Sequence, residues 1–366
     1  MTHASRAVAL VYGFWGQNIG NAFFNVGGDW ILNEVVGDDV HVARIQDQPG
    51  YRTFHPQAKG NPPRDLGLLS RIRPDAVVLQ GPMLTDTFRA LWEPAFRAYA
   101  AAGIPVVLLG AALFRFSEEE QAAAAAFLRE YPPAIFSSRD HDSYEFVAGL
   151  GLPTACYDGI DSAFFVPRAV HNVPMVDEPY FTFTFDRFPE PSVVLGDDAA
   201  APSDSRSFEF EDTTFTLSEP PVQRVASKAG KWQAYFGHVV DRRSLPAEIL
   251  GRTIVRPEHR HTPHMTRKIY QHPNAVVSDE PYTYFTLYGA TDLTLSDRVH
   301  ACVATLAFDG PAMLFTPSPR ARLFDRLDLS DIRDRPVRLA PERLAAEQEA
   351  ELDFLRGAFG DLGLAP

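Results

Sequence analysis

The stretch Pro105-Val106-Val107-Leu108-Leu109 is a short, continuous apolar run, and it decides the fold class. Such a run is typical of a parallel strand that is covered on both faces of its sheet. Ser117-Glu118-Glu119-Glu120 then has the pattern that begins a helix, Ala122–Glu130 continues it, and Pro132-Pro133 ends it. These features predict one strand and one crossover helix of a parallel α/β sheet.

The same alternation extends through residues 1–165, which we predict to form an N-terminal Rossmann-like domain. Asp140–Leu150 is a further predicted helix of this part, and Gly151 ends it. The predicted strands are Ala7–Tyr12, His41–Ile45, Ala76–Leu79, Val106–Leu109, Ala134–Phe136 and Thr154–Tyr157.

Composition changes after Phe165, and the α/β rhythm resumes later in the chain. We predict a Pro- and Phe-rich linker with an antiparallel β-hairpin at 166–225, because Ser207–Leu217 alternates apolar and polar residues. Within the linker, Tyr180–Phe185 reads as a half-buried strand. Residues 226–340 are a second Rossmann-like domain, and 341–366 are a C-terminal amphipathic helix. The elements predicted in the second domain are Arg252–Val255, Ala275–Val277, Pro281–Tyr288, Asp292–Leu295, Val299–Phe308, Ala312–Phe315 and Ser318–Leu327.

The overall charge argues against nucleic acid as a partner. Lys and Arg number 34 against 47 Asp and Glu, a formal net charge of −13, whereas proteins that grip phosphate backbones carry a basic excess. Ala7–Tyr12 is too short for a signal-peptide core, and no run approaches the ~18 apolar residues of a membrane span. With only two cysteines in the chain, we expect a soluble, cytoplasmic protein.

The strongest local signal for chemistry is Ser296-Asp297-Arg298-Val299-His300, between a predicted strand and a predicted helix. Side chains at the carboxyl end of a parallel strand face the ligand edge of the sheet. Ser296 is the expected N-cap of the helix, Arg298 can clamp a carboxylate or phosphate, and His300 titrates near neutral pH. The alternative is that Arg298 is a solvated first-turn residue and His300 a core histidine.

A second basic segment, Arg256–His264, also follows a predicted strand. We select Arg256 and His259 as candidate phosphate contacts, against the alternative of a solvated loop bounded by prolines. His259, His261 and His264 are closely spaced, but no cysteine or well-spaced carboxylate completes a metal site, so we predict no metal.

The loop Gly16–Asn21 follows the first predicted strand and lacks the glycine spacing of a dinucleotide fingerprint. Asn18 and Asn21 are candidates for hydrogen bonds to substrate hydroxyls, unless they only complete a tight turn. Arg139 either reaches the cleft expected between the two domains or caps its own helix.

Four segments together resemble the polysaccharide pyruvyl transferase family. In Asp292–Phe315, Ser296, Arg298, His300 and Gly310–Ala312 match its Ser-x-Arg-x-His motif and the Gly-x-Pro turn after the helix. Gly16–Asn21 resembles its first loop and Ser138–Ser143 its Arg-Asp-x-x-Ser segment. Asp161–Phe164 resembles its Asp-Pro-Ala-Phe, with Ser162 in place of Pro. The matches lie in register over residues 8–330, whereas 167–221 does not match.

The resemblance implies a glycosyltransferase-B-like pair of domains, the N-terminal one on the acceptor side and the C-terminal one on the donor side. It also implies transfer of the pyruvyl group of phosphoenolpyruvate to two hydroxyls of a saccharide or sugar carrier, which forms a cyclic ketal and releases phosphate. Arg298 and His300 would then contact phosphoenolpyruvate, and no cofactor is expected. The alternatives are a nucleotide-sugar-dependent glycosyltransferase of the same shape and a non-catalytic carbohydrate-binding relative. The oligomeric state stays open.

Overall fold

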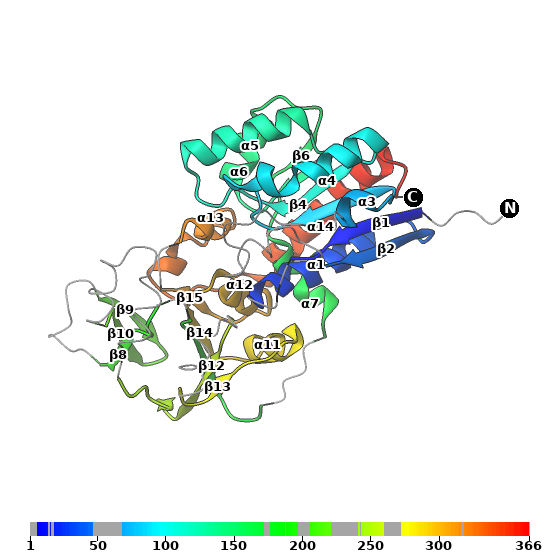
Figure 1. The fold of residues 1–366 in the computed structure, drawn as a ribbon. Coiled ribbons are helices and arrows are strands. Elements are labelled where there is room, and N and C mark those ends of the chain that lie inside the picture. The colour runs from blue at the N-terminus through cyan, green and yellow to red at the C-terminus, as the bar shows by residue number, and fades with distance from the viewer. Residues whose placement is uncertain are drawn as a thin grey trace.

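The computed structural model describes residues 6–13, 15, 18–46, 68–171, 176–186, 188–196, 205–220, 241, 243–259, 272–315 and 318–365. It has two sheets of parallel strands with helices around them and one small antiparallel sheet, and the two lobes are arranged as in glycosyltransferases of the B type (Figure 1). This confirms the predicted fold class.

The N-terminal lobe is built on a six-stranded parallel sheet with the order β2-β1-β3-β4-β5-β6. Its helix starts follow the sequence signals, since the Ser117 side chain accepts a hydrogen bond from the Glu120 amide and Asp140 caps the helix at His141. The strands are β1 (Arg6–Val11), β2 (Val40–Ile45), β3 (Ala76–Gln80), β4 (Val106–Ala111), β5 (Ile135–Ser138) and β6 (Ala155–Tyr157), and the helices are α1 (Gly20–Val35), α3 (Leu68–Arg71), α4 (Phe88–Ala102), α5 (Glu118–Glu130) and α6 (His141–Ala148).

The C-terminal lobe is built on a second sheet with the path β11-β12-β7-β14-β15. Neighbouring strands are parallel except β11, and β13 pairs with β12 off the path. The strands are β7 (Tyr180–Thr184), β11 (Glu248–Ile249), β12 (Arg252–Pro257), β13 (Ala275–Val276), β14 (Leu293–Ser296) and β15 (Ala312–Leu314), and the helical segments are α11 (Pro281–Tyr288), α12 (Val299–Ala307), η4 (Pro319–Ala321), α13 (Arg322–Asp325) and η5 (Ser330–Arg333).

Strand β7 departs from the sequence-based expectation. The alternation of Tyr180–Phe185 predicts a half-buried strand, but every residue of β7 is buried, because the strand lies between β12 and β14 with both faces covered. Threonines occupy its polar positions: the Thr182 and Thr294 hydroxyls lie 2.5 Å apart, so the strand satisfies its polar atoms inside the lobe. The alternation therefore separates two buried faces of the strand and does not mark a solvent-exposed face.

The predicted hairpin is present as an antiparallel sheet with the order β8-β10-β9. Its strands are β8 (Ser192–Leu195), β9 (Arg206–Phe210) and β10 (Thr213–Ser218). Figure 1 shows it at the end of the C-terminal lobe away from the N-terminal lobe. Phe208, Phe215 and Leu217 of this sheet bury their side chains with Phe181 and Phe183 of β7, so it covers one face of the second sheet.

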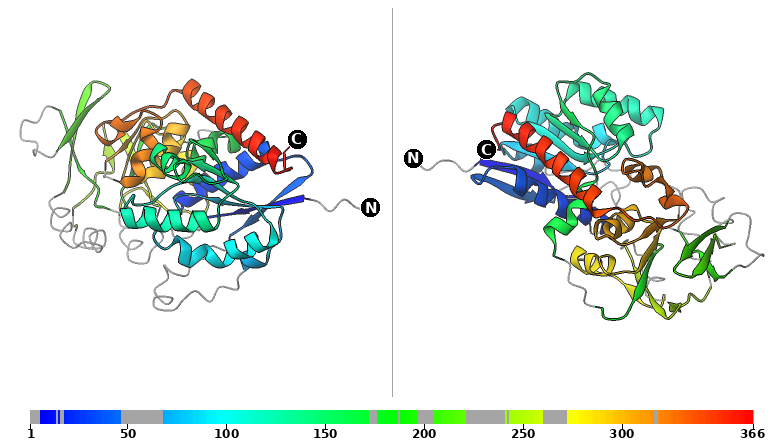
Figure 2. Two further views of the ribbon diagram at one scale, coloured as in Figure 1. Left: turned by 90° about the horizontal axis from the view of Figure 1, so that it is seen from above. Right: turned by 180° about the vertical axis from the view of Figure 1, so that it is seen from behind.

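A shared apolar layer joins the lobes. It contains residues of α1, of η2 (Ser162–Phe165) and α7 (Val166–Ala169), of α11 and α12, and of α14 (Pro341–Asp361). α1 lies against η2 so closely that a methyl group added at Gly27 would lie 1.7 Å from the Ser162 carbonyl oxygen. α14 crosses back to the N-terminal lobe, as Figure 2 shows, and the Gly37 amide donates to the Leu364 carbonyl just beyond it. Among the described helices, none has the length and apolar character to cross a membrane.

Candidate functional site

The carboxyl ends of both parallel sheets meet at the start of α1. A methyl group added at Gly20 would lie 3.1 Å from His300 Nδ1, 3.2 Å from His259 Nδ1 and 3.3 Å from Asn18 Oδ1. Both imidazole rings therefore present Nδ1 to the same point on the N-terminal lobe. The Ile19 amide also donates to the His259 carbonyl oxygen at 2.9 Å, which joins the two lobes here. Three predicted candidates, His300, His259 and Asn18, thus converge on one glycine.

His300 is buried on α12, and its other ring nitrogen faces a carboxylate of the N-terminal lobe. Nε2 lies 3.5 Å from Asp161 Oδ2, and Arg139 donates to that same oxygen at 2.9 Å. Burial lowers the pKa of His300, and the carboxylate of Asp161 only partly opposes this. Burial acts to raise the pKa of Asp161, but His300 and Arg139 outweigh it and hold that pKa below its usual value. Burial thus favours the neutral form of His300, and its neighbours favour the ionised form of Asp161.

This geometry decides between the two roles predicted for Arg139. The arginine does not cap α6, since Asp140 does so, and it reaches inward to Asp161 instead. Asp161 in turn accepts from the Ala163 amide and begins η2. Arg139 and Asp161 are each 1 % exposed, and Asp161 lies between the arginine and the His300 ring.

Arg298 is buried rather than solvated. Among the described residues, it makes no direct contact with His300. Its Nε forms an ion pair with Asp186, and Asp297 Oδ1 lies 3.8 Å away. Asp186 also accepts from the His259 amide at 2.9 Å, so it connects Arg298 to the histidine pair. The guanidinium is thus neutralised within its own lobe.

Ser296 is not the N-cap of α12. It is still paired within β14, where its hydroxyl donates to the Thr184 carbonyl at 3.1 Å and accepts from the Arg298 amide at 2.8 Å. Arg298 occupies the N-cap position without a capping hydrogen bond from its side chain, and the helix begins at Val299. Because the strand runs one residue further than the sequence suggests, the serine hydroxyl supports the strand-to-helix turn.

Arg256 is taken up by the protein itself. Its Nε and Nη2 donate to the two carboxylate oxygens of Glu190 at 2.7 and 2.9 Å, and further bonds go to the Pro246 and Pro273 carbonyls. Arg256 is 1 % exposed. We therefore withdraw it as a phosphate contact and assign it a structural role.

The remaining predicted residues lie at the edge of the same region. The Asn18 amide donates to Asn21 Oδ1 at 3.2 Å, which closes the turn that leads into α1. His259 Nε2 pairs with the Tyr288 hydroxyl at 2.7 Å, and Tyr288 contacts Thr184 at 2.9 Å. His261 and His264 lie outside the described residues. Within the described part of the chain, no group of three or more metal-ligating side chains comes together.

Sequence reasoning missed the acidic side of this region. Asp186, Glu258 and Asp297 follow the carboxyl ends of β7, β12 and β14. Burial, and then the charges of Asp186 and Asp297, raise the pKa of Glu258 well above its usual value and favour its protonated form. Glu258 Oε2 and Arg298 Nη2 are both buried without a hydrogen-bond partner among the described residues. Position directly after a predicted strand was the signal available for these acids.

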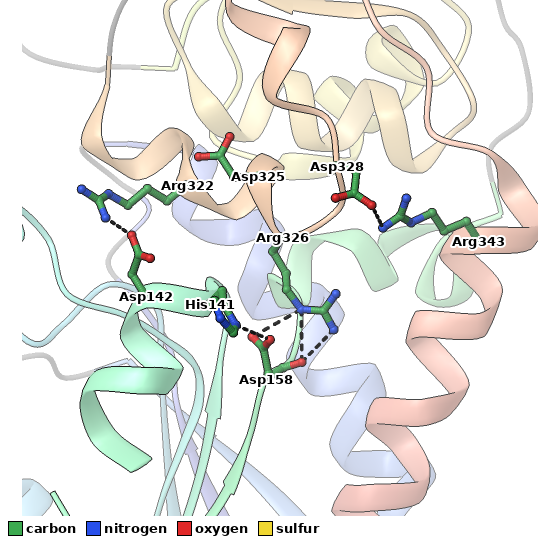
Figure 3. Close-up of a pocket in the computed structure, with 8 residues that line it drawn as sticks. All are labelled: His141, Asp142, Asp158, Arg322, Asp325, Arg326, Asp328 and Arg343. Atoms are coloured by element: carbon green, nitrogen blue, oxygen red, sulfur yellow. Dashed lines mark hydrogen bonds and ion pairs between the residues drawn. The ribbon is translucent and has the colours of Figure 1, made fainter. Parts of the chain in front are cut away.

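An outer pocket of about 450 Å³ lies between the lobes, and its lining residues are distinct from those of the buried cluster. Arg322 and Arg326 enter it from the C-terminal lobe, and His141, Asp142 and Asp158 from the N-terminal lobe (Figure 3). Arg322 forms an ion pair with Asp142, and Arg326 Nη2 donates to the Asp158 carbonyl at 2.9 Å. His141 Nδ1 lies 2.8 Å from Asp158 Oδ2, and this carboxylate raises the pKa of His141. With Asp325, Asp328 and Arg343 included, the lining holds as many aspartates as basic side chains, and ion pairs join the two lobes across it.

Two turns connect the outer pocket to the buried cluster. Arg139 faces inward and His141 outward at the end of β5, while Asp161 faces inward and Asp158 outward after β6. The pocket residues His141 and Asp158 are therefore only a few positions along the chain from Arg139 and Asp161. No sequence signal singled out Arg322 or Arg326, because they approach Asp142 and Asp158 only through the packing of the lobes.

Comparison with known proteins gives a likeness of fold. No family model matches the sequence, and no curated protein matches it. The structure is similar to UDP-N-acetylglucosamine 2-epimerase from Rickettsia bellii, with a TM-score of 0.50 and 11% identity over 99% of this chain and 96% of that chain. The UDP-GlcNAc 2-epimerase from Methanocaldococcus jannaschii gives 0.48 at 12% identity (95% and 93% covered), and the one from Neisseria meningitidis bound to UDP-GlcNAc gives 0.47 at 12% (96% and 93%).

These findings correct the functional expectation from the sequence. The assignment to the polysaccharide pyruvyl transferases is wrong, and so is phosphoenolpyruvate as the partner, because no family model supports them and the similar structures are UDP-GlcNAc 2-epimerases. The shared motif letters are short, and a buried Arg298 neutralised by Asp186 is poorly suited to clamp a small trianion. What the comparisons do show is the two-lobed fold.

Proposed function

We propose that this chain is an enzyme that acts on a nucleotide sugar, a nucleoside diphosphate linked to a saccharide. The observation that carries the proposal is the interlobe pocket with Arg322 and Arg326, whose lining residues His141 and Asp158 belong to the same two turns as Arg139 and Asp161. The fold is shared with the Rickettsia bellii enzyme, whose name states UDP-N-acetylglucosamine as the substrate. A nucleotide-sugar-dependent glycosyltransferase is the other reaction class that this fold and site fit.

The pocket suits the diphosphate part of such a ligand. Its volume of about 450 Å³ falls in the range of roughly 300–1,000 Å³ usual for small-molecule sites. Arg322 and His141 are about half exposed, so they can exchange a carboxylate partner for a phosphate oxygen. Guanidinium groups bind phosphate oxygens through paired, charge-assisted hydrogen bonds. The pocket also holds Asp325 and Asp328, so binding of the anion depends on this exchange of partners.

The buried cluster suits proton transfer at the sugar. With His300 neutral and Nε2 turned to Asp161, the Nε2–H tautomer leaves Nδ1 as a proton acceptor. Burial and the neighbouring acids raise the pKa of Glu258 in the same lobe, which suits it to donate a proton. Cleavage of the bond between the anomeric carbon and the diphosphate oxygen would benefit from a proton donor and a proton acceptor in a water-poor site.

Ligand-induced stabilisation tests the proposal. UDP-GlcNAc and UDP should raise the melting temperature, with a gain of about 2.7 kcal/mol at a hundredfold excess over Kd, whereas inorganic phosphate should not. R322A should bind UDP at least about tenfold more weakly, because a charge-assisted hydrogen bond contributes ~1.5–3 kcal/mol. R335A is the matched control, since Arg335 pairs with the exposed Asp331 and does not line the pocket.

The reaction class is read from the products. Incubation with UDP-GlcNAc, followed by proton NMR, distinguishes inversion at C2 from transfer of the sugar to an added acceptor with release of UDP. Absence of any stabilisation by UDP or UDP-GlcNAc, or an equal loss in R322A and R335A, would overturn the proposal.

A further inference from the structure

Helix α14 carries a buried carboxylate that its amphipathic pattern does not call for. Glu351 is fully buried, beside the apolar residues Leu352 and Leu355 of the same helix face. Burying a carboxylate costs free energy unless its oxygens are hydrogen-bonded, and a leucine here would suit an ordinary helix contact better. A polar group at this place calls for a role other than packing.

The two carboxylate oxygens of Glu351 accept hydrogen bonds from β5 and from the turn that follows β6. The Ser137 hydroxyl donates to Oε1 at 2.5 Å, and the Ile160 amide donates to Oε2 at 3.1 Å. Between them lies Gly159, where an added methyl group would be 2.4 Å from Ser137 Oγ and 2.7 Å from Glu351 Oε1. The turn therefore packs tightly against β5 at Gly159.

That turn, residues 158–161, carries both carboxylates that organise the candidate site. Asp158 holds His141 and Arg326 in the pocket, while Asp161 holds Arg139 and faces His300. We propose that Glu351 is a positioning residue, which sets the orientation of His300 and of the pocket by fixing this turn from the C-terminal helix. That the site so positioned acts on a nucleotide sugar rests on the proposed function.

The environment of Glu351 adds a pH signature to this role. Burial raises its pKa to about 7, against the hydrogen bonds from Ser137 and Ile160. Two charged groups face it from neighbouring elements, Arg326, which opposes the rise, and Asp161, which adds to it. Tyr157 on β6 is the remaining titratable group close by, and burial raises its pKa too. A proton on Glu351 should therefore come and go near neutral pH.

The test follows the His300 ring by histidine NMR in the full-length protein without ligand, with signals assigned through H300Q. E351Q keeps an acceptor for Ile160 and a polar partner for Ser137, so the His300 signals should match those of the wild type at low pH. They should lose the step that the wild type shows near pH 7. E351L, which removes both bonds, should move or broaden the His300 signals and weaken UDP binding about tenfold or more.

E349Q is the matched control, since Glu349 lies on the same helix and pairs with the exposed face of Arg168. It should leave both readouts unchanged. Wild-type His300 signals in E351L, or a pH step that survives in E351Q, would overturn the proposal; if E351L does not fold, S137A, which removes the hydrogen bond to Glu351 Oε1, takes its place. If the His300 signals respond as expected but UDP binds to no variant, positioning stands and the proposed function fails.

Discussion

At the scale of single residues, the site depends on a glycine, Gly20, where any side chain would meet two histidine rings. Gly20 is the first residue of α1, and it allows both imidazole rings to approach the helix start. A contact of 3.1–3.2 Å from a methyl group to ring nitrogens is tighter than normal packing, so a side chain there must displace the rings.

G20A should therefore reduce UDP-GlcNAc binding more than it reduces stability. Alanine favours a helix over glycine by about 0.4–1 kcal/mol, which offsets part of the steric cost. G357A is the matched control, because Gly357 lies in α14 with no other atom within 4 Å of an added methyl group. Urea unfolding and ligand-induced thermal shifts measure the two effects; unchanged binding in G20A would show that the histidines do not contact the ligand.

Two buried groups make stability depend on pH with opposite signs. The pKa of Glu351 is raised to about 7, so its contribution is full below about pH 4.5 and is lost as pH rises to about 7, by about 3 kcal/mol. The pKa of His300 is lowered, so its contribution is present above pH 6.5 and is lost as pH falls.

Urea unfolding at pH 5, 6, 7 and 8 separates the two contributions. E351Q should lose less stability than the wild type between pH 5 and pH 7, and H300Q should lose less as pH falls below 6.5. Parallel curves for the wild type and both variants would show that neither group is linked to folding.

At the scale of elements, a buried ion pair replaces the predicted phosphate contact. Arg256 on β12 and Glu190, in the segment between β7 and β8, form a two-point pair with both partners less than 6 % exposed. Burial raises the pKa of Glu190 although Arg256 opposes it, so the carboxylate depends on its partner to stay ionised.

R256A should destabilise the protein by about 3–5 kcal/mol, because it leaves a buried carboxylate without its partner. R343A should cost less than about 1 kcal/mol, since the pair of Arg343 with Asp328 is exposed. Chemical unfolding of the two variants gives the comparison. A small effect of R256A combined with lost ligand binding would return Arg256 to the ligand site.

At the scale of the whole molecule, the two lobes share one apolar layer. Phe23 of α1 lies at the middle of it, with the rings of Phe285 and His259 centred 4.8 and 5.4 Å away. The helices α11, α12 and α14 complete the layer from the other lobe and from the C-terminal end of the chain. Interfaces of this apolar kind couple the stability of the units they join.

The lobes should therefore unfold together. Scanning calorimetry should show one heat-capacity peak whose calorimetric and van't Hoff enthalpies agree. F23A should cost about 3–5 kcal/mol and weaken this coupling, because it removes a buried ring from the shared layer. Two separate peaks in the wild type would contradict the expectation.

The sequence alone determined the elements, because apolar period, caps and proline stops act over a few residues. Helix starts at Ser117 and Asp140 and the strand before Arg298 were all predictable from local physics. So was the convergence of residues that follow strands, since parallel strands present their carboxyl ends at one edge.

Only the tertiary structure decided how those residues act. In the folded protein, Arg298 pairs with Asp186 and Arg256 pairs with Glu190. Glu351 of the last helix bonds to a turn almost two hundred residues earlier in the chain. The tertiary structure also buries β7 on both faces and brings Arg322 and Arg326 across to the other lobe. The physical reason is that charge pairing and burial depend on contacts distant in the chain, which no local pattern of residues encodes.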